Sequence, residues 1–278
     1  MAVLPRGRLL PPAAGRGPPT LRSSTASEWV APQRPTRADP EGGDTEAMVE
    51  MSPEQAREFW KALMDNATSL IADAHTLLSV KSYGRARSLS VLAQEELGKA
   101  LWIYDAFEVD WSFGGETLRI VDDLKKHGRN HTEKYLEAVD FGDELPGFWG
   151  DYSAQPTLGT SYEAWEENRE RRRAEARVAA KEANLAKQNG FYVDRDADGV
   201  VMSPTAIQAG TTAEDLQTAA QVIEMLLIKD HSRMKSSTER YDSTHTQQFR
   251  LLRVSHPEEW AVEMVDPEAE EGQEPEEQ

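Results

Sequence analysis

The sequence SYGRARSLSVLAQEELGKA, from Ser82 to Ala100, has the pattern of a helix that packs against its neighbours and also carries charge. Its small and apolar side chains recur at steps of three and four residues, the period of an amphipathic helix: Tyr83, Ala86, Ser90, Ala93, Leu97 and, just beyond the stretch, Leu101 and Tyr104. Glu95, Glu96 and Lys99 lie among them, where a helix that only packs would carry leucine or alanine. Gly98 costs a helix interior roughly 1 kcal/mol relative to alanine, and the close approach of another backbone or a ligand explains it best. The stretch therefore predicts a polar site within a helical core.

Helical periodicity continues on both sides of this stretch. The residues SPEQ at 52–55 form a helix start, with a serine cap, a proline in the first turn and a glutamine that completes a capping box. The short turn at Lys81-Ser82 predicts that the first two helices pack as an antiparallel hairpin. Near 190–204, two short β-like runs flank an Asp-Gly turn and predict a small hairpin or extended flap. We therefore expect an all-α bundle of about five helices, over about 52–79, 82–109, 116–139, 161–188 and from 212 onward.

The two ends of the chain differ from the middle in composition. Residues 1–50 are rich in proline, glycine and arginine without periodicity, so we expect a disordered N-terminal extension. We hypothesise that translation starts at Met48 or Met51 and not at the first residue. Residues 254–278 carry ten acidic residues and no lysine or arginine, which predicts an acidic disordered tail. The helical domain is then expected over 51–253.

Composition excludes several classes of protein. The chain of 278 residues has no cysteine, so disulfides, thiolate zinc sites and cysteine nucleophiles are excluded, which fits a reducing cytoplasm. Its formal net charge is −18, which argues against nonspecific nucleic-acid binding because phosphate contacts need clustered cations. The longest apolar segment, around Val222–Ile228, is too short to cross a bilayer. We therefore expect a cytoplasmic protein with no membrane partner, in which any RNA-directed activity comes from a local site.

The sequence DLKKHGRNHTEKY, from Asp123 to Tyr135, holds the first candidate for acid–base chemistry. It brings His131, Arg129 and Lys134 close together on the predicted third helix, with His131 on the apolar face. Imidazole titrates near neutrality and takes a proton from a ribose hydroxyl, while arginine or lysine neutralises a phosphate. A histidine on an apolar face is also a common core residue that only satisfies its hydrogen bonds. The charged residues of the second helix, one helix away, favour a site.

Arg240 and His245 form a second candidate pair, on the predicted continuation of the last helix. Their side chains would lie on neighbouring helical faces and would converge on one phosphate. The spacing alone is weak, because arginine and histidine are common enough to produce it by chance.

No cofactor and no metal is expected. A carboxylate-bridged metal bundle needs two Glu-x-x-His units, and the chain has none; Asp242-x-x-His245 is the nearest relative. The aspartates of 194–198 begin like a calcium loop, but the twelfth position is Thr205, where that loop needs glutamate. Phosphate loops, dinucleotide-binding fingerprints and serine-nucleophile motifs are absent as well.

Four blocks, in a fixed order, carry a resemblance to a known family. The blocks are Ala67–Leu78 with its Asp73-Ala74; Tyr83–Ala86 leading to AQEELGKA at 93–100; Asp110-Trp111 with Arg129–Lys134; and NGFYVD at 189–194 running to Ser203-Pro204. Together they span about Phe59 to Tyr241, and the EELGK block with the GFYVD block is fairly specific. The chain resembles the AbiV family of bacterial abortive-infection proteins, a branch of the HEPN superfamily.

The resemblance implies a HEPN-like helical bundle and a role in anti-phage defence, in which an infected cell halts its own growth or translation. HEPN relatives often act as metal-independent endoribonucleases and as dimers, with an Arg-x4–6-His motif at the subunit interface. Arg240–His245 has that spacing, whereas Arg129 lies only two residues before His131. The resemblance thus implies a homodimer that acts on RNA or on the translation machinery.

Two functions are compatible with these residues. If the protein is an enzyme, we expect it to cleave RNA with His131 as the general base. Arg129 and Lys134 would neutralise the phosphate, and Glu95, Glu96 and Lys99 would orient the imidazole. The alternative is a non-catalytic interaction protein that binds a phage protein or a translation component. The glutamates and lysine of the second helix would then form a buried polar network that fixes helix register.

Overall fold

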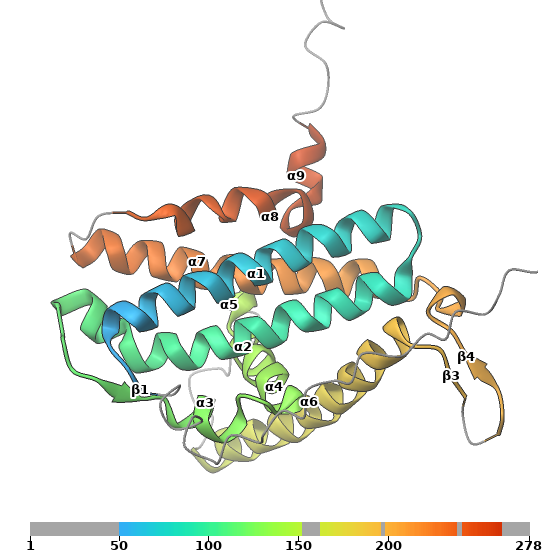
Figure 1. Ribbon diagram of the computed structural model, residues 1–278, viewed down its shortest axis with the longest axis horizontal. Coiled ribbons are helices and arrows are strands. Elements are labelled where there is room, and N and C mark those ends of the chain that lie inside the picture. Colours follow the sequence, from blue (N-terminus) through green and yellow to red (C-terminus); the bar gives the residue numbers. More distant parts are fainter. Residues whose placement is uncertain (1–49, 152–161, 196–197, 238–240, 263–278) are drawn as a thin grey trace, which may run out of the picture. The chain divides into compact units, whose positions relative to one another are not determined.

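The computed structural model describes residues 50–151, 162–195, 198–237 and 241–262, and Figure 1 shows their path. Within these ranges the structure is nearly all helical, apart from two small two-stranded sheets. The predicted all-α bundle is therefore confirmed. None of the described helices combines the length and the apolar character needed to cross a bilayer.

The first two helices, α1 (Pro53–Ser79) and α2 (Tyr83–Phe113), form the predicted antiparallel hairpin (Figure 1). α1 begins with the predicted capping box, in which Ser52 and Gln55 each bond the backbone N–H of the other. α2 ends at Gly114, whose φ of 74° is the left-handed conformation that favours glycine.

Residues 116–139, predicted as one helix, contain a strand, one short helix and part of a second helix, so the prediction of a continuous helix is wrong. The elements here are β1 (Glu50–Met51), β2 (Arg119–Ile120), α3 (Asp122–His127) and α4 (His131–Gly142). β2 pairs antiparallel with β1, with Arg119 opposite Met51.

Asn130 causes the break between α3 and α4. Its side-chain oxygen accepts hydrogen bonds from the backbone N–H groups of Thr132 and Glu133, which is the geometry of an N-cap. Such a cap starts a new helix without disturbing the spacing of apolar residues, so the periodicity of the sequence does not reveal it. His131 is consequently the first residue of α4 and does not lie in the middle of a long helix.

The second half of the chain supplies two more long helices and several short elements. They are α5 (Leu145–Phe148), α6 (Tyr162–Phe191), β3 (Asp194–Arg195), β4 (Val201–Met202), η1 (Pro204–Ala206), α7 (Thr212–Ser237), η2 (Ser243–Thr246), α8 (Gln248–Ser255) and α9 (Pro257–Val262). β3 and β4 pair as an antiparallel hairpin, which confirms the small flap predicted near 190–204.

Two predictions for the end of the chain differ from the structure. α7 ends at Ser237 and η2 is a separate short helix, so the predicted continuation of the last helix through His245 is wrong. Asp242 caps η2 by accepting the backbone N–H of the residue two positions on, which starts a new turn there. Arg240 and the side chain of His245 lie outside the described residues. α8 and α9 continue into the segment predicted as a disordered tail.

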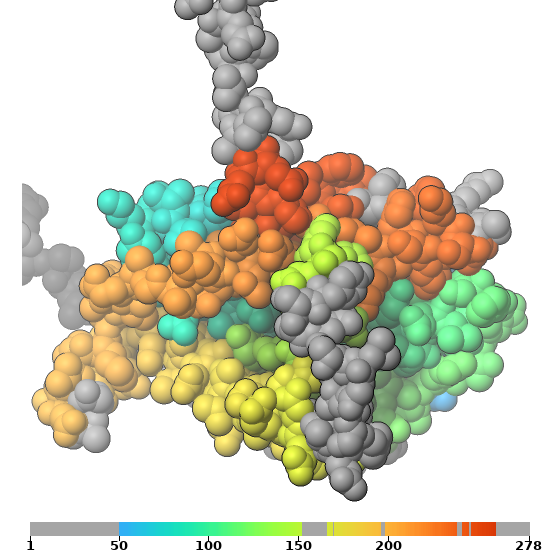
Figure 2. Space-filling view, turned by 180° about the vertical axis from the view of Figure 1, so that it is seen from behind, coloured from blue at the N-terminus to red at the C-terminus, as the bar shows by residue number. Residues whose placement is uncertain are grey.

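α2 is the central helix of the bundle, because it packs against α1, α4, α6 and α7. On the face shown in Figure 2, α6 and α7 both reach the surface, and α5 lies against α7. The main core includes Trp60 of α1, Phe107 of α2 and Ile223 of α7. Because neighbours surround α2 on several sides, a charged residue in its middle is placed in the interior.

Candidate functional site

The site predicted on α2 centres on Glu95, which is only 2% exposed. Three side chains from other helices contact its carboxylate. Nδ1 of His131, at the start of α4, lies 2.6 Å from Oε2. Lys187 of α6 donates to Oε1, and Nζ of Lys134 of α4 lies 3.6 Å from Oε2. We call Glu95, His131, Lys134 and Lys187 the Glu95 cluster.

Glycines let the neighbouring helices come close enough to reach this carboxylate. A Cβ at Gly98 would overlap the backbone carbonyl of Lys134, so only glycine admits α4 at this distance. A Cβ at Gly190 of α6 would overlap Ser88 of α2 in the same way. Ser88 Oγ also donates to the carbonyl of Lys187 at 2.9 Å, which holds α6 against α2. The prediction that another backbone approaches Gly98 is therefore confirmed.

The members of the Glu95 cluster differ in exposure. The His131 side chain is 52% exposed, whereas those of Lys134 and Lys187 are 7% and 9% exposed. Burial lowers the pKa of Lys134, and the negative charge of Glu95 opposes that shift. Lys134, predicted to neutralise a phosphate, is thus turned inward. Within the cluster, the imidazole is the most exposed group.

The contact with Glu95 determines what the His131 ring can do. A carboxylate at Nδ1 favours the tautomer that carries its proton there, which leaves Nε2 as the basic nitrogen. Among the described residues, only Glu95 is bonded to this ring. Nε2 is therefore open to a ligand, and a carboxylate–imidazole pair of this kind supports general-base chemistry.

The other predicted site residues lie near the cluster in sequence without joining it. Glu96 and Lys99 pair with each other on α2, with 2.7 Å between Oε1 and Nζ. In the described chain no hydrogen bond or ion pair joins them to the His131 ring, so Glu95 alone orients it. Arg129 is exposed on the turn between α3 and α4, two residues before His131.

The ring of His131 lines a pocket with a volume of about 320 Å³. α6 supplies most of the pocket wall from one helical face, at steps of three and four residues. With His131, the lining consists of Leu92, Asn184, Lys187, Gln188, Phe191 and Tyr192. Oδ1 of Asn184 is buried and accepts no hydrogen bond from any residue in the described ranges. The basic nitrogen of the cluster thus lies beside a space for a small ligand.

The described residues offer no ready metal site. In the ranges that the structure covers, no group of three or more His, Asp or Glu side chains is placed to hold a metal ion. Of the aspartates that resemble a calcium loop, Asp194 and Asp198 are exposed, and Asp196 lies outside the described residues.

Lys187 is the member of the cluster that the sequence did not single out. It lies 92 positions after Glu95, in a helix whose charges resemble those of a solvated face. The available signal is its position two residues before the NGFYVD block. A pairing across such a distance depends on tertiary packing, which the helical period does not encode.

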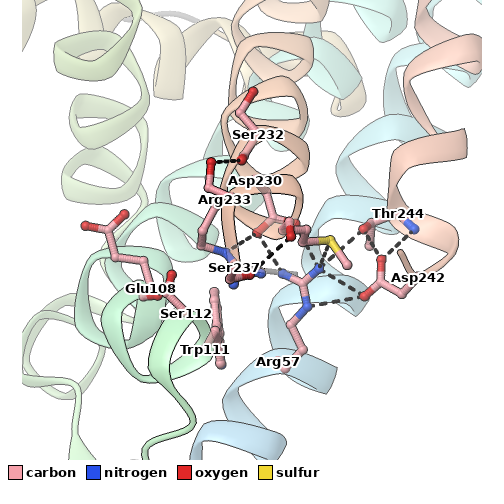
Figure 3. A network of polar contacts seen from close by, with 12 residues as sticks. Arg57, Glu108, Trp111, Ser112, Asp230, Ser232, Arg233, Ser237, Asp242 and Thr244 are labelled. Atoms are coloured by element: carbon pink, nitrogen blue, oxygen red, sulfur yellow. Dashed lines mark hydrogen bonds and ion pairs between the residues drawn. The ribbon is translucent and has the colours of Figure 1, made fainter. Parts of the chain in front are cut away.

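A second buried polar network, also not predicted, surrounds Arg57 of α1 (Figure 3). Its guanidinium donates to both carboxylate oxygens of Asp230 on α7, at 3.0 and 2.8 Å, and to Asp242 at 2.9 Å. It also lies over the rings of Trp60 and Trp111, 4.6 and 5.2 Å from their centroids. Burial lowers the pKa of Arg57, but the hydrogen bonds and charges of the two aspartates outweigh burial and raise it overall.

The Arg57 network joins three segments and does not form a site for a ligand. Arg57, Asp230 and Asp242 come from α1, from α7 and from the residue before η2. Arg57 is 9% exposed and directs its donors at the two aspartates, so its charge is not available to solvent. We therefore assign this network a structural role.

Comparison with known protein families identifies the chain. The AbiV family model, of the HEPN type, matches residues 55–224, which is more than half of the chain. The matched span contains the whole Glu95 cluster and Gly98, and it ends within α7 before Asp230. No match was found among the curated proteins or among the solved structures. The predicted resemblance is confirmed, and the chain belongs to the AbiV family of HEPN proteins.

Proposed function

We propose that this chain is an abortive-infection protein that shuts down gene expression or translation by cleaving RNA at the Glu95 cluster. Membership in the AbiV family indicates the role in abortive infection, that is, in phage defence. The observation that carries the proposed cleavage is the contact between a half-exposed imidazole, His131, and a buried carboxylate, Glu95. This pair supplies a basic nitrogen, and the adjoining pocket supplies a place for a substrate.

The proposed step is attack of a ribose 2′-oxygen on the adjacent phosphorus. Nε2 of His131 takes the proton of the 2′-hydroxyl as the bond from the 2′-oxygen to phosphorus forms. The bond from phosphorus to the 5′-oxygen breaks, that oxygen takes a proton from water, and the hydroxide left behind takes the proton back from the imidazolium. The products are a 2′,3′-cyclic phosphate and a 5′-hydroxyl. Glu95 stabilises the imidazolium that forms, as the buried carboxylate of a catalytic triad does.

We propose that Arg129 neutralises the charge of the substrate phosphate. Lys134 and Lys187 are buried and paired with Glu95, whereas Arg129 is an exposed cation close to His131 in sequence. Arg129 is exposed and precedes His131 by two residues, and a guanidinium is suited to neutralise a phosphate. We therefore assign Lys134 to the neutralisation of Glu95.

Incubation of the purified full chain with total RNA and with transfer RNA, each with and without a chelator, tests the cleavage. We expect discrete fragments whose formation needs no divalent metal. In His131→Ala, cleavage should fall about 10²–10⁴-fold, the usual contribution of a general base. His75→Ala changes an exposed histidine of α1 outside the cluster and is the matched control. Normal cleavage by a folded His131→Ala protein would remove His131 from the mechanism, and intact RNA with the unaltered chain would reject cleavage.

Plaque counts on cells that express the chain test the defence role. We expect fewer plaques with the unaltered chain than with an empty vector. Protection should be lost in His131→Ala, because the proposed shutdown depends on the imidazole. Equal plaque counts with and without a folded, unaltered chain would contradict a role in defence.

The buried lysines of the Glu95 cluster favour a second function, which is non-catalytic. Two of the three partners of Glu95 are buried lysines, and the chain carries a net charge of −18. Neither property favours RNA binding. The alternative is a non-catalytic protein that binds a phage protein or a translation component, with the cluster fixing how α2, α4 and α6 pack. Protection that persists in a folded His131→Ala chain, with no RNA fragments from either protein, would favour this alternative.

We also propose that the protein acts as a homodimer, which the HEPN resemblance supports. Light scattering of the purified chain measures its mass in solution. A mass equal to that of one 31.1 kDa chain at all concentrations would contradict the dimer.

A further inference from the structure

The pocket beside His131 has features that general-base chemistry does not itself require. Its volume of about 320 Å³ is near the lower end of the range for small-molecule sites, about 300–1,000 Å³. Such a space takes one small planar ligand and excludes a base-paired helix. Two exposed aromatic rings and one amide with an unmet hydrogen bond line it.

Phe191 and Tyr192 place aromatic rings at this pocket. Phe191 is the last residue of α6, and Tyr192 follows it. They are 38% and 69% exposed, although phenylalanine is among the residues most often fully buried. Aromatic rings in this situation serve as stacking surfaces for the unpaired bases of single-stranded nucleic acids.

Asn184 presents an acceptor without a donor. Its Oδ1 is buried, and no residue in the described part of the chain bonds to it. Buried acceptors are ordinarily satisfied in native proteins, so this one indicates a missing partner. An N–H group at the edge of a nucleobase would supply the donor, and the amide nitrogen of the same side chain would donate to a neighbouring acceptor of the base.

We propose that this pocket binds a single unpaired RNA base, stacked on Tyr192 and hydrogen-bonded through its edge to Asn184. The inference rests on the proposed RNA cleavage and deepens it, because a base held here brings its ribose and phosphate within reach of His131. It also explains how an acidic chain selects RNA, since stacking and an amide contact need no cationic surface. A free nucleotide has the same chemistry, so the test separates the two sources.

Calorimetric titration of the full chain with each nucleoside 5′-monophosphate, and with ribose 5-phosphate as a base-free probe, tests the pocket. We expect at least one nucleotide to bind and ribose 5-phosphate to show no measurable binding. Tyr192→Ala should weaken nucleotide binding about fivefold or more, the usual contribution of one base stacked on an aromatic ring. Tyr192→Phe keeps the ring and should bind normally. Phe249→Ala removes a similarly exposed ring outside the pocket and is the matched control.

Asn184→Leu tests the hydrogen bond to the base. Leucine keeps the approximate size of the side chain and removes its acceptor, so the affinities for the four nucleotides should become more alike. Because Oδ1 has no partner within the described chain, its loss should leave the unfolding temperature unchanged. An unchanged order and spread of affinities in Asn184→Leu would overturn the assignment of Asn184.

The outcomes distinguish this inference from the proposed cleavage. Normal nucleotide binding by Tyr192→Ala, or equal binding of ribose 5-phosphate and nucleotides, would overturn the base pocket even in a protein that cleaves RNA. Binding that depends on Tyr192 in a protein that cleaves no RNA would support the pocket and reject the cleavage. A single-stranded oligoribonucleotide that binds more tightly than any monophosphate would support RNA as the source of the base, and the reverse order would overturn it.

Discussion

The guanidinium of Arg57 donates hydrogen bonds to two carboxylates within the bundle. The planar shape of the guanidinium explains why arginine is present here. Its five N–H donors lie in one plane, so two parallel bonds to Asp230 leave further donors for Asp242. The flat group also stacks on the rings of Trp60 and Trp111. A side chain with one point charge or with none cannot make all of these contacts.

Arg57→Met should lower the free energy of unfolding by about 3–5 kcal/mol, because it leaves the buried carboxylate of Asp230 without its bidentate partner. Urea denaturation measures the change. Arg250→Met is the matched control, since Arg250 pairs with Asp65 at 3.1 Å but both side chains are more than half exposed. That pair should contribute less than about 1 kcal/mol. Similar losses in the two variants would show that burial does not set the strength of the Arg57 network.

The buried arginine also explains a limit of prediction at single residues. The apolar spacing of α1 includes Phe59 in the buried face, yet Phe59 is 38% exposed while Trp60 beside it is fully buried. When the buried face of a helix contains a charged residue, a pattern that counts only apolar residues assigns the buried face to the wrong side of the helix. Gly98 and Glu95 could be predicted because their neighbours in sequence are informative. The partners of Arg57 and Glu95 could not, because Asp230 and Lys187 lie far away along the chain.

At the scale of elements, the close approach of α4 to α2 depends on Gly98, which has no side chain. Alanine at position 98 would favour the helical conformation by roughly 1 kcal/mol. Its Cβ would also overlap the carbonyl of Lys134, which is backbone and cannot rotate away. Overpacking of this kind costs about 1–3 kcal/mol, so steric overlap should outweigh helix propensity.

Gly98→Ala should therefore lower the free energy of unfolding by up to about 2 kcal/mol in thermal or urea denaturation, which is the overpacking cost less the gain in helix propensity. It should also reduce any RNA cleavage further than the loss of folded protein explains, because separating α2 from α4 lengthens the contact between Glu95 and His131. Gly142→Ala, at the end of α4, is the control, since its Cβ would meet only the side chain of Val222 at 3.3 Å. A Gly98→Ala protein more stable than the unaltered chain would contradict this account.

Element boundaries were predictable only where a turn or a cap stands outside an apolar run. The capping box at 52–55 precedes such a run, and the flap near 190–204 contains a glycine, Gly199, with a φ of 85°. Asn130 caps α4 from within a helical pattern, so the sequence predicted one helix where there are two. The end of α7 at Ser237 has no glycine or proline to mark it.

At the scale of the whole bundle, negative charge is concentrated at a pocket of about 650 Å³. Lys229 lines this pocket together with five carboxylates. The carboxylates are those of Asp105, Glu108, Glu137, Asp140 and Glu144. Burial raises the pKa of Glu137, a hydrogen bond from Trp102 opposes this, and the charges of neighbouring aspartates raise the pKa further. The net shift is upward, so the folded protein holds this proton more tightly than the unfolded chain does.

The raised pKa of Glu137 predicts how stability depends on pH. Its contribution to stability is present below the unfolded pKa, near 4.5, and is lost as the pH rises through the higher folded pKa. Glu137→Gln should therefore raise the free energy of unfolding at pH 7 and flatten its decline above pH 4.5, as measured by urea denaturation over a pH series. Glu170→Gln, at an exposed position of α6, is the control. Parallel pH curves for the unaltered chain and Glu137→Gln would refute the assignment.

The architecture of the bundle was predictable to a greater extent than its interior pairings. Helical periods and one short turn gave an all-α fold with an antiparallel hairpin, because both depend on neighbours in sequence. The way α4 and α6 cross α2 depends on contacts such as those of Gly98 and Gly190 with distant residues. The predicted approach of Glu95 to His131 is present, while the second cation, Lys187, comes from a helix that showed no functional pattern.

Because one buried carboxylate is the ion-pair partner of ammonium groups from two helices, substitutions at positions 95, 134 and 187 should be coupled. Loss of Glu95 alone would leave two buried ammonium groups without their carboxylate, and removing both of those charges would require two further substitutions. Single substitutions at these positions should therefore be destabilising unless the others change as well. Among diverging homologues, the residues at 95, 134 and 187 should therefore be inherited or replaced as a set.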